Sequence, residues 1–352
     1  MNTYTFPILR LMADGKFHSG EVIARHLNVT RTTVWQALQH AASIGVTVYS
    51  VPGRGYKLPA PLMLLDELAI SQAIGEQRAW FKLVVLDEVD STNSYLMQQL
   101  NQSKDSNGLT HLAAHMLAKA TAHATCVAAQ VQTNGRGRRG RSWQAGLGAS
   151  LTFSVLWRFQ CGASGLSGLS LAVGVALIRA LHGLGVASAQ LKWPNDVLVF
   201  DPAGQAKKLA GILIELQGDM DGPSAAVIGV GVNLNLSESL RDAIDQPVVD
   251  LHELTTQSAN PLQINPNELL GNLLKHLADV LSDFERDGFG SVRDEWTHYH
   301  AYEAKLVRLL VPDGREVQGV VCGVADDGIL LVETSAGLQR FSSAEISLRG
   351  LQ

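Results

Sequence analysis

The chain of 352 residues is long enough for two or three domains with a sizeable core. Its 46% hydrophobic and 17% charged residues fit an ordinary globular protein, and three widely spaced cysteines fit neither a disulfide framework nor a zinc site. The N-terminus shows no secretory signal, and the longest apolar run, Leu169 to Ile178, is about half the length needed to cross a bilayer. We therefore expect a cytoplasmic protein.

The net charge of −5 is unevenly distributed along the chain. Residues 1–58 hold six lysines and arginines against two acids, a balance of +4, so the remainder carries −9. A basic N-terminal segment attached to an acidic body indicates that the segment, and not the body, meets nucleic acid.

Residues 1–60 predict a small helical domain. Apolar periodicity and capping residues predict helices over residues 4–13, 20–27 and 31–43, and a hairpin with a basic tip follows over residues 46–58. This order is typical of a winged helix-turn-helix that binds DNA, although a protein-interaction module of the same shape is an alternative. The expected DNA-contacting residues are Gly20, Thr30, Arg31, Thr32, Thr33, Gln36, Gln39, His40 and Arg54.

The body begins after a proline-containing linker. A predicted strand over residues 81–86 ends in polar residues, and a predicted helix runs from residue 94 to 100. The Ser-Thr-Asn run at 91–93 either caps that helix or presents short donors and acceptors at a strand end. Residues 102–122 are interpreted as an insertion of no evident function.

Residues 135–141 contain only glycine and arginine, and with Ser142 and Trp143 they form what we call the Arg/Gly loop (residues 135–143). Such a segment has no apolar surface to bury, and its glycines make it a poor helix or strand. It could be a disordered RNA-binding segment or a solvated basic loop. However, strand-like residues 126–129 and 151–156 flank it and provide a rigid scaffold. We therefore expect its guanidiniums to bind phosphate or carboxylate, and the loop to become ordered only when an anion arrives.

A helix rich in Ala and Gly is predicted over residues 169–184, followed by strand-like segments over 191–199, 207–216 and 225–233. Lys192 lies among apolar neighbours just before a proline. It is either a charge on an edge strand or a cation directed into a site, and its position alone does not decide between these.

Three glycines, Gly211, Gly229 and Gly231, interrupt strands that are otherwise strongly apolar. Glycine inside a strand either lets a ligand or another backbone come close or marks a bulge. Residues 303–352 then form short segments joined by regular turns, which predicts a small β-barrel.

The chain lacks the motifs of several common enzymes: a Walker-type loop, a Gly-x-Ser-x-Gly elbow, a zinc-spaced histidine pair and a redox cysteine pair. The Arg/Gly loop and Lys192 instead suit the attack of a carboxylate on the α-phosphate of ATP, where fixed cations stabilise the developing charge. A closed loop would also protect the acyl-adenylate from water. The residues do not identify metal ligands.

In this order the segments resemble one known family, the bifunctional biotin–protein ligases and biotin-operon repressors. The resemblance extends over nearly the whole chain, and its second motif is the most specific. The motifs are Asp90-Ser-Thr-Asn93, Gln132-x-x-Gly-Arg-Gly-Arg-x-Gly-Arg-x-Trp143, Lys192-Trp-Pro-Asn-Asp196, Lys208-Leu-Ala-Gly-Ile-Leu-Ile-Glu215 and Gly229-Val-Gly-Val-Asn233.

The resemblance implies an α+β multidomain fold. Its parts would be a winged helix-turn-helix over residues 1–60, a class II synthetase-like body with a mixed sheet and helices on one side over 62–300, and an SH3-like β-barrel over 303–352. It further implies that biotin and ATP, with Mg²⁺, give biotinyl-5′-AMP. Biotin would then pass to a lysine of the biotin carboxyl carrier protein of acetyl-CoA carboxylase. With biotinyl-5′-AMP as corepressor, a homodimer formed by strand pairing would bind the biotin operator.

Residue roles also follow from the resemblance. Ser91, Thr92, Asn93 and Gln132 would hold the biotin ring system. The loop residues that would fold over the adenylate are Gly135, Arg136, Gly137 and Arg138, with Trp143 helping to order them. Lys192 would contact the biotin carbonyl and the α-phosphate, which makes Lys192, Arg138 and Arg136 the expected catalytic residues. Gly211, Gly229 and Gly231 would let strand backbones approach the ligand, with Asn233 nearby.

Two segments depart from the family pattern. Residues 102–122 lengthen a helix-to-strand connection, and residues 236–260 match poorly where an adenine-covering segment is expected. Two alternative functions remain, namely a repressor that senses a small acid without ligase activity and a lipoate-type acyl–protein ligase.

Overall fold

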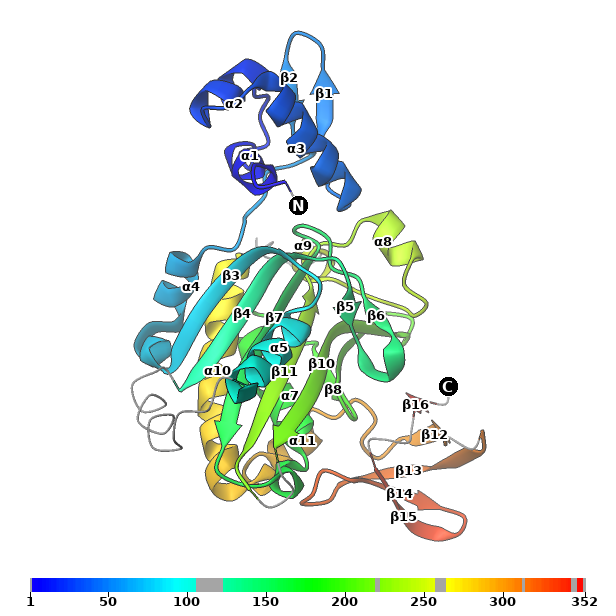
Figure 1. The fold of residues 1–352 in the computed structure, drawn as a ribbon. Coiled ribbons are helices and arrows are strands. Elements are labelled where there is room, and N and C mark those ends of the chain that lie inside the picture. The colour runs from blue at the N-terminus through cyan, green and yellow to red at the C-terminus, as the bar shows by residue number, and fades with distance from the viewer. Residues whose placement is uncertain are drawn as a thin grey trace.

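The computed structural model describes residues 2–105, 123–218, 222–256, 264–311, 314–342 and 347–350. Its elements form an N-terminal helical head, a central sheet with its helices, and a small C-terminal sheet (Figure 1).

The head contains the three helices and the hairpin that the sequence predicts. Side-chain caps define where two of the helices begin: Ser19 Oγ accepts from the Val22 amide at 3.1 Å, and Thr30 Oγ1 accepts from the Thr33 amide at 3.1 Å. The winged helix-turn-helix prediction is therefore confirmed, with α1 Thr5–Leu11, α2 Gly20–His26, α3 Arg31–Ser43, β1 Tyr49–Val51 and β2 Gly55–Lys57.

The centre of the molecule is a seven-stranded mixed sheet in the order β3-β4-β7-β11-β10-β9-β8. β3 and β4 run parallel and every other neighbouring pair is antiparallel. The strands are β3 Phe81–Val89, β4 Ala124–Gln132, β7 Ser150–Phe159, β8 Gln190–Lys192, β9 Asp196–Phe200, β10 Ala206–Gly218 and β11 Ser224–Asn233.

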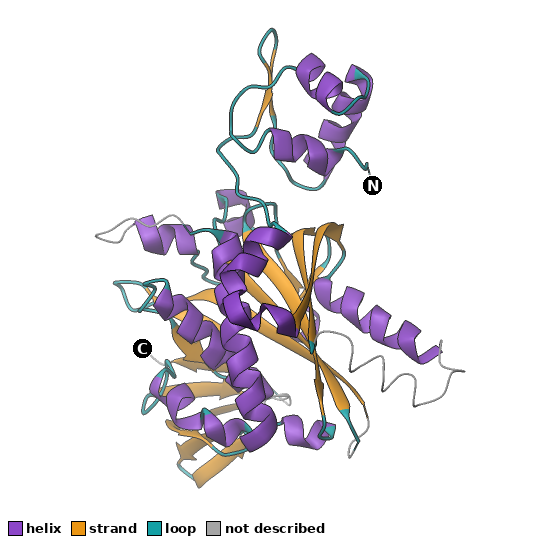
Figure 2. Cartoon of the chain, turned by 90° about the vertical axis from the view of Figure 1, so that its left-hand side faces the viewer, coloured by secondary structure: helices purple, strands orange, loops and turns teal. Residues whose placement is uncertain are grey.

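Helices cover both faces of this sheet (Figure 2). One face packs against α7 and α10 in the main core, whereas on the other face Leu96 of α5 packs against Val127, Leu156 and Val227. The expectation of helices on one side only is therefore wrong, because apolar residues alternate onto both faces of the central strands. The helices of the body are α4 Glu67–Ile74, η1 Gly75–Trp80, α5 Thr92–Asp105, η3 Ala163–Leu166, α7 Leu169–Gly183, α8 Glu238–Asp242, α9 Leu251–Thr256, α10 Pro266–Asp287, η4 Phe289–Ser291 and α11 Arg293–His298.

The helix α7 is the most apolar element of the described chain. By length and composition alone the segment Ala163–Gly183 could cross a membrane, although its longest uninterrupted apolar run is short. Two thirds of its best window (67%) is buried inside the protein, as expected for the central helix of a packed core.

The C-terminal region is an antiparallel five-stranded sheet in the order β15-β14-β13-β12-β16. Four strands were predicted from the turns and one, β16, was missed. The strands are β12 Leu306–Leu310, β13 Glu316–Val324, β14 Leu330–Thr334, β15 Gly337–Phe341 and β16 Ser347–Gly350. Of the expected insertion at 102–122, residues 106–122 lie outside the described part of the chain.

The close packing of α10 on α4 gives a test of the core. A Cβ at Gly271 would lie 2.3 Å from Ala73 Cβ, so Gly271→Ala must push the helices apart. We expect it to lower the free energy of unfolding by about 1–3 kcal/mol in a urea titration. The control, Gly183→Ala, places its Cβ where nothing lies within 4 Å and should be neutral or slightly stabilising. Equal effects of the two substitutions would contradict this packing.

Candidate functional site

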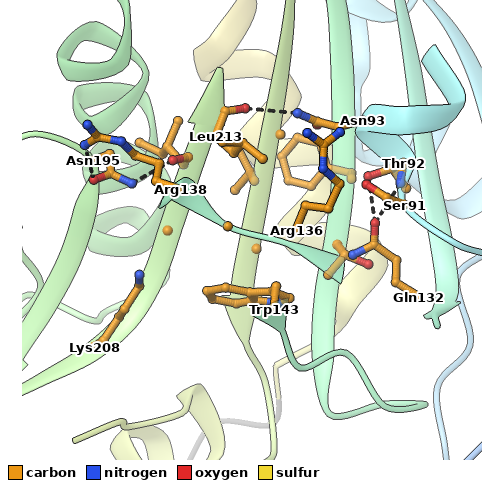
Figure 3. A pocket seen from close by; sticks show the side chains of 18 residues that line it. Ser91, Thr92, Asn93, Gln132, Arg136, Arg138, Trp143, Asn195, Lys208 and Leu213 are labelled. Carbon is orange, nitrogen blue, oxygen red and sulfur yellow. Dashed lines mark hydrogen bonds between the residues drawn. The ribbon is translucent and has the colours of Figure 1, made fainter. Parts of the chain in front are cut away.

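The parallel pairing of β3 and β4 brings two predicted site segments together. Because both strands end at the same edge of the sheet, Thr92, just after β3, meets Gln132, the last residue of β4. The Thr92 amide donates to Gln132 Oε1 at 2.7 Å, and the Thr92 hydroxyl oxygen lies 3.1 Å from the same atom (Figure 3). The capping alternative is also seen, since Ser91 Oγ accepts from the Ser94 amide at a long 3.5 Å.

These residues line a cavity of about 60 Å³ on the sheet face that carries α5. Small-molecule sites commonly reach roughly 300 Å³ or more, so a ligand of that size requires side chains or the loop to move. The lining residues are Ser91, Thr92, Asn93, Gln132, Arg136, Gly137, Arg138, Trp143, Thr152, Phe153, Asn195, Lys208, Gly211, Ile212, Leu213, Gly229, Val230 and Gly231.

A second cavity of about 320 Å³ lies where Leu169 and Ser170 at the start of α7 face Gly328 in the turn between β13 and β14. Asp327 is the single titratable residue among its lining. The first cavity concentrates cations and hydrogen-bonding groups, and it is therefore the candidate site.

Three glycines form the floor of the candidate site, and we call Gly211, Gly229 and Gly231 the glycine floor. A Cβ at Gly231 would lie 2.4 Å from Cε2 of Trp143, and one at Gly229 would lie 2.2 Å from Asn93 Oδ1. The pairing of β10 with β11 is continuous through all three, so the bulge alternative fails in this pair of strands. In this structure the space above the floor is taken by protein side chains.

The Arg/Gly loop lies over the glycine floor as a short ribbon, with β5 Gly135–Arg136 paired to β6 Ser142–Trp143 and the turn η2 Arg138–Gly140 between them. The expectation that this segment is a poor strand is wrong, because its side chains are anchored. Arg136 forms an ion pair with Glu215 at 2.8 Å, and Arg138 Nη1 donates to Asn195 Oδ1 at 3.0 Å.

Arg138 is the most enclosed cation of this loop. Burial lowers the pKa of its guanidinium, and the neighbouring Arg139 lowers it further, while Asp196 acts in the opposite direction. Arginine still keeps its charge near neutral pH. Partly desolvated positive charge attracts an anion more strongly than the same charge in water.

The cation on the sheet side of the cavity is Lys208, not Lys192 (Figure 3). Lys208 Nζ lies 2.7 Å from Asp196 Oδ1 and 5.7 Å from the ring of Trp143. Lys192 is on β8, the outermost strand, and does not line the cavity. Lys208 is therefore a further candidate, and the catalytic role expected of Lys192 stays a prediction. The sequence signal was available, because Lys208 lies three residues before Gly211.

Two other predicted residues support the site from outside its lining. Gly135 forms the base of the loop, where a Cβ would lie 2.4 Å from the Trp143 carbonyl oxygen. Asn233 Nδ2 donates to the carbonyls of Lys208 and Val249 at 3.2 and 3.1 Å, so it holds the backbone of Lys208. Sequence reasoning missed the lining residues Thr152, Phe153, Asn195, Lys208, Ile212, Leu213 and Val230.

Two buried polar atoms in the cavity have no hydrogen-bond partner among the described residues: Thr152 Oγ1 and Trp143 Nε1. Such groups cost free energy when they are left unpaired. A polar ligand could satisfy both.

On the head, most predicted DNA-contacting residues are accessible. Arg54 at the wing tip stacks over the Phe17 ring at 4.2 Å, and Trp35 of α3, which was not predicted, is 53% exposed. Gly20 and Thr33 are half-buried, and the fully exposed members of the set are Thr30, Arg31, Thr32, Gln36, Gln39 and Arg54.

His40, also expected to contact DNA, instead faces the body. Its Nε2 lies 3.2 Å from Glu88 Oε2 on β3, and Arg10 of α1 forms an ion pair with Asp87 of the same strand. Val131 of β4 also packs into the core of the head. The head is thus fixed beside the strand ends that form the candidate site, and the assignment of His40 to DNA is corrected.

Comparisons with known sequence families give three matches along the chain. Residues 7–57 match an HTH domain, residues 85–233 match the biotin/lipoate A/B protein ligase family, and residues 305–349 match the biotin protein ligase C-terminal domain. Together with the fold and the cavity, these matches define a ligase body that carries a DNA-binding head.

Individual relatives agree with this class. The chain is 32% identical over 351 residues to the bifunctional ligase/repressor BirA of Escherichia coli, covering 100% of this chain and 99% of the relative. It is 31% identical to the biotin–[acetyl-CoA-carboxylase] ligase of Paracoccus denitrificans, covering 68% and 97% of the two chains. The solved biotin protein ligase of Aquifex aeolicus, in complex with biotin and ATP, shares 28% identity at a TM-score of 0.57, covering 77% and 99%. The chain belongs to the biotin protein ligase family, among its bifunctional ligase/repressors.

The contact between head and body predicts a measurable effect of charge. Glu88→Lys would place a cation against His40 and close to Arg10, so we expect the head to separate from the body more often. A loss of about 1 kcal/mol should raise the cleavage rate of the linker at residues 59–66 about fivefold in limited proteolysis. The control Glu76→Lys changes an exposed residue of η1 and should cleave like the unmodified protein. Equal rates for both variants would contradict the contact.

Proposed function

We propose that this chain joins biotin and ATP to form biotinyl-5′-AMP and then transfers biotin to a lysine of an acceptor protein. The observation that carries the proposal is the division of the cavity into two ends (Figure 3). Neutral hydrogen-bonding groups lie at one end, around Thr92 and Gln132. The cations Arg138 and Lys208 line the other end, whereas the third cation of the lining, Arg136, lies beside Asn93 with its charge paired to Glu215.

The neutral end suits the ureido ring of biotin, which has two N–H donors and one carbonyl acceptor. Ser91, Thr92 and Asn93 are each 3% exposed, so their polar groups are largely shielded from water. The atoms of the cavity without a partner among the described residues are Thr152 Oγ1 and Trp143 Nε1, and a ring that lacks N–H and carbonyl groups would leave them unpaired. The dithiolane ring of lipoate has no N–H or carbonyl to offer.

The cationic end suits the attack of the biotin carboxylate on the α-phosphate of ATP. The two anions repel each other, and Arg138 and Lys208 would stabilise the charge that develops as the new oxygen–phosphorus bond forms and pyrophosphate leaves. Asp196 fixes the position of the Lys208 ammonium at 2.7 Å. Lys208 is proposed here in addition to Lys192, which stays the expected contact of the biotin carbonyl and the α-phosphate.

In the second step the ε-amine of an acceptor lysine attacks the carbonyl of biotinyl-5′-AMP, forming an amide and releasing AMP. We propose that the acceptor is the biotin carboxyl carrier protein of acetyl-CoA carboxylase. Until that step, the Arg/Gly loop would shield the mixed anhydride from water.

Mg²⁺ would accompany ATP. Among the described residues no group of three or more His, Cys, Asp or Glu side chains could hold a metal ion. This fits an ion held largely by the triphosphate, which is common for Mg²⁺ in nucleotide sites, with Asp196 as the nearest candidate carboxylate. Its chemistry there would be to neutralise phosphate charge.

We also propose that the adenylate-bound protein acts as a homodimer on operator DNA, in the cytoplasm. β9 pairs with β10 only as far as Gly211. Beyond Ile212, whose amide and carbonyl bond to Asn195, no described strand pairs with that side of β10 from Leu213 to Gly218, and Leu216 is 43% exposed there. A second copy could add its own strand at this edge. The exposed face of α3 and the wing of each head would then read one half of a two-fold operator.

The ligase activity predicts pyrophosphate release that requires both biotin and ATP. We expect a coupled phosphate assay to respond to biotin and to give no comparable rate with lipoate at equal concentration. A response to lipoate alone would favour the lipoate-type ligase. Binding of biotin without pyrophosphate release would favour a repressor that senses a small acid.

The enclosure of Arg138 predicts how its loss would act. Arg138→Ala removes a cation and a contact of the loop with Asn195, so the adenylate should still form, although more slowly, and should then escape into solution. We expect unrelated proteins in the assay to become biotinylated on surface lysines, detected by streptavidin blot. Arg315→Ala, in the C-terminal region, is the control. If Arg138→Ala retains the adenylate as the unmodified protein does, the loop does not hold it.

A further inference from the structure

Glu215 of β10 contacts two functional segments at once. Its Oε1 accepts from Arg136 Nη2 at 2.8 Å, and its Oε2 accepts from Arg136 Nη1 at 3.2 Å and from Asn93 Nδ2 at 2.9 Å. One carboxylate therefore connects the Arg/Gly loop to the neutral end of the cavity, although it does not itself line that cavity.

The carboxylate fixes which way the Asn93 amide points. An ionised carboxylate only accepts hydrogen bonds, so the amide nitrogen must face Glu215, where it also reaches the Leu213 carbonyl at 3.3 Å. Asn93 Oδ1 then points to Gly229 and lies 2.6 Å from Ser154 Oγ. The amide thus presents an acceptor on the glycine floor.

The same orientation extends through a buried chain of hydrogen bonds. Ser154, which is fully buried, also lies 2.6 Å from Thr92 Oγ1. Because the single Ser154 proton goes to Asn93 Oδ1, the Thr92 hydroxyl donates to Ser154, and Gln132 Oε1 accepts from the Thr92 amide. Reversing the Asn93 amide would set a donor against the Ser154 hydroxyl, whose proton would then have to point to Thr92. Glu215 therefore determines which atoms at the neutral end donate hydrogen bonds and which accept them.

The Arg136 contact acts on the loop. The guanidinium and carboxylate meet through two hydrogen bonds, a geometry that restricts rotation as well as separation. Arg136 also donates to Ser94 Oγ of α5 at 3.3 Å. These contacts fix the first strand of the loop ribbon, opposite the end that Arg138 holds.

We propose that Glu215 is a positioning residue of the ligase: it orients the Asn93 amide toward the biotin ring and holds the Arg/Gly loop through Arg136. The inference rests on the proposed function. On this proposal the charge of Glu215, and not merely its size, determines both how biotin is recognised and how long the adenylate stays bound.

Glu215→Gln tests this because the amide keeps the shape of the side chain but can donate as well as accept. We expect the KM for biotin, measured by pyrophosphate release, to rise about three- to tenfold with a smaller change in kcat. The half-life of bound biotinyl-5′-AMP after desalting should fall by a similar factor, the size expected when a charge-assisted hydrogen bond is weakened. Glu316→Gln removes a distant arginine partner in the C-terminal sheet, where Arg308 lies 3.4 Å away, and should leave both values unchanged.

A double-mutant cycle tests the contact from the loop side. Arg136→Ala changes a side chain that is 43% exposed and should fold normally. If the two residues act through one contact, Arg136→Ala combined with Glu215→Gln should release adenylate no faster than Arg136→Ala alone. Additive effects on release would overturn the loop half of the proposal.

The outcomes separate this inference from the proposed function. If the unmodified protein releases pyrophosphate with biotin and Glu215→Gln matches it in KM and half-life, the positioning role is wrong and the ligase stands. If the unmodified protein itself shows no biotin-dependent release, the proposed function fails first.

Discussion

The site depends on how closely Trp143 and Asn93 approach the backbones of β10 and β11. Trp143 lies over Gly231 and Asn93 lies over Gly229 at distances that leave no room for a Cβ, and at Gly211 a Cβ would lie a tight 3.3 Å from Trp143. The glycine floor therefore lets one sheet face hold both a loop and a hydrogen-bonding helix start without an intervening layer of side chains. A ligand that enters must displace part of this packing, because the remaining cavity is only about 60 Å³.

The rest of the body positions groups around this floor. The parallel pair β3 and β4 delivers Thr92 and Gln132 to one end, whereas the antiparallel β9 and β10 deliver Asp196 and Lys208 to the other. The head contacts the body at the end of the site that holds Thr92 and Gln132. Arg10 and His40 of the head meet Asp87 and Glu88, only a few residues before the Ser-Thr-Asn run. Helix α3 of the head and the candidate site thus meet at the same strand ends, which is a physical route for coupling them.

Sequence reasoning predicted the elements well where local signals decide the structure. Ser19 and Thr30 begin helices as their side chains suggest, and the strands around the glycine floor are apolar enough to read directly. The errors concern contacts between distant segments. Nothing local tells that His40 will meet Glu88, that Glu215 will anchor the loop, or that Lys208 inside β10 will line the cavity. The helix of α5 was predicted, but the expectation of helices on one side of the sheet left out that it covers the second face.

Amide hydrogen exchange of residues 135–143, followed by mass spectrometry, tests the account most directly. The cavity is too small for an adenylate, so the loop must open and then close around its ligand. We predict that biotin and ATP together slow exchange across the loop strongly, and that ATP alone does so far less. If exchange in these residues is the same with both ligands as with neither, the loop does not close over an adenylate and the account is wrong.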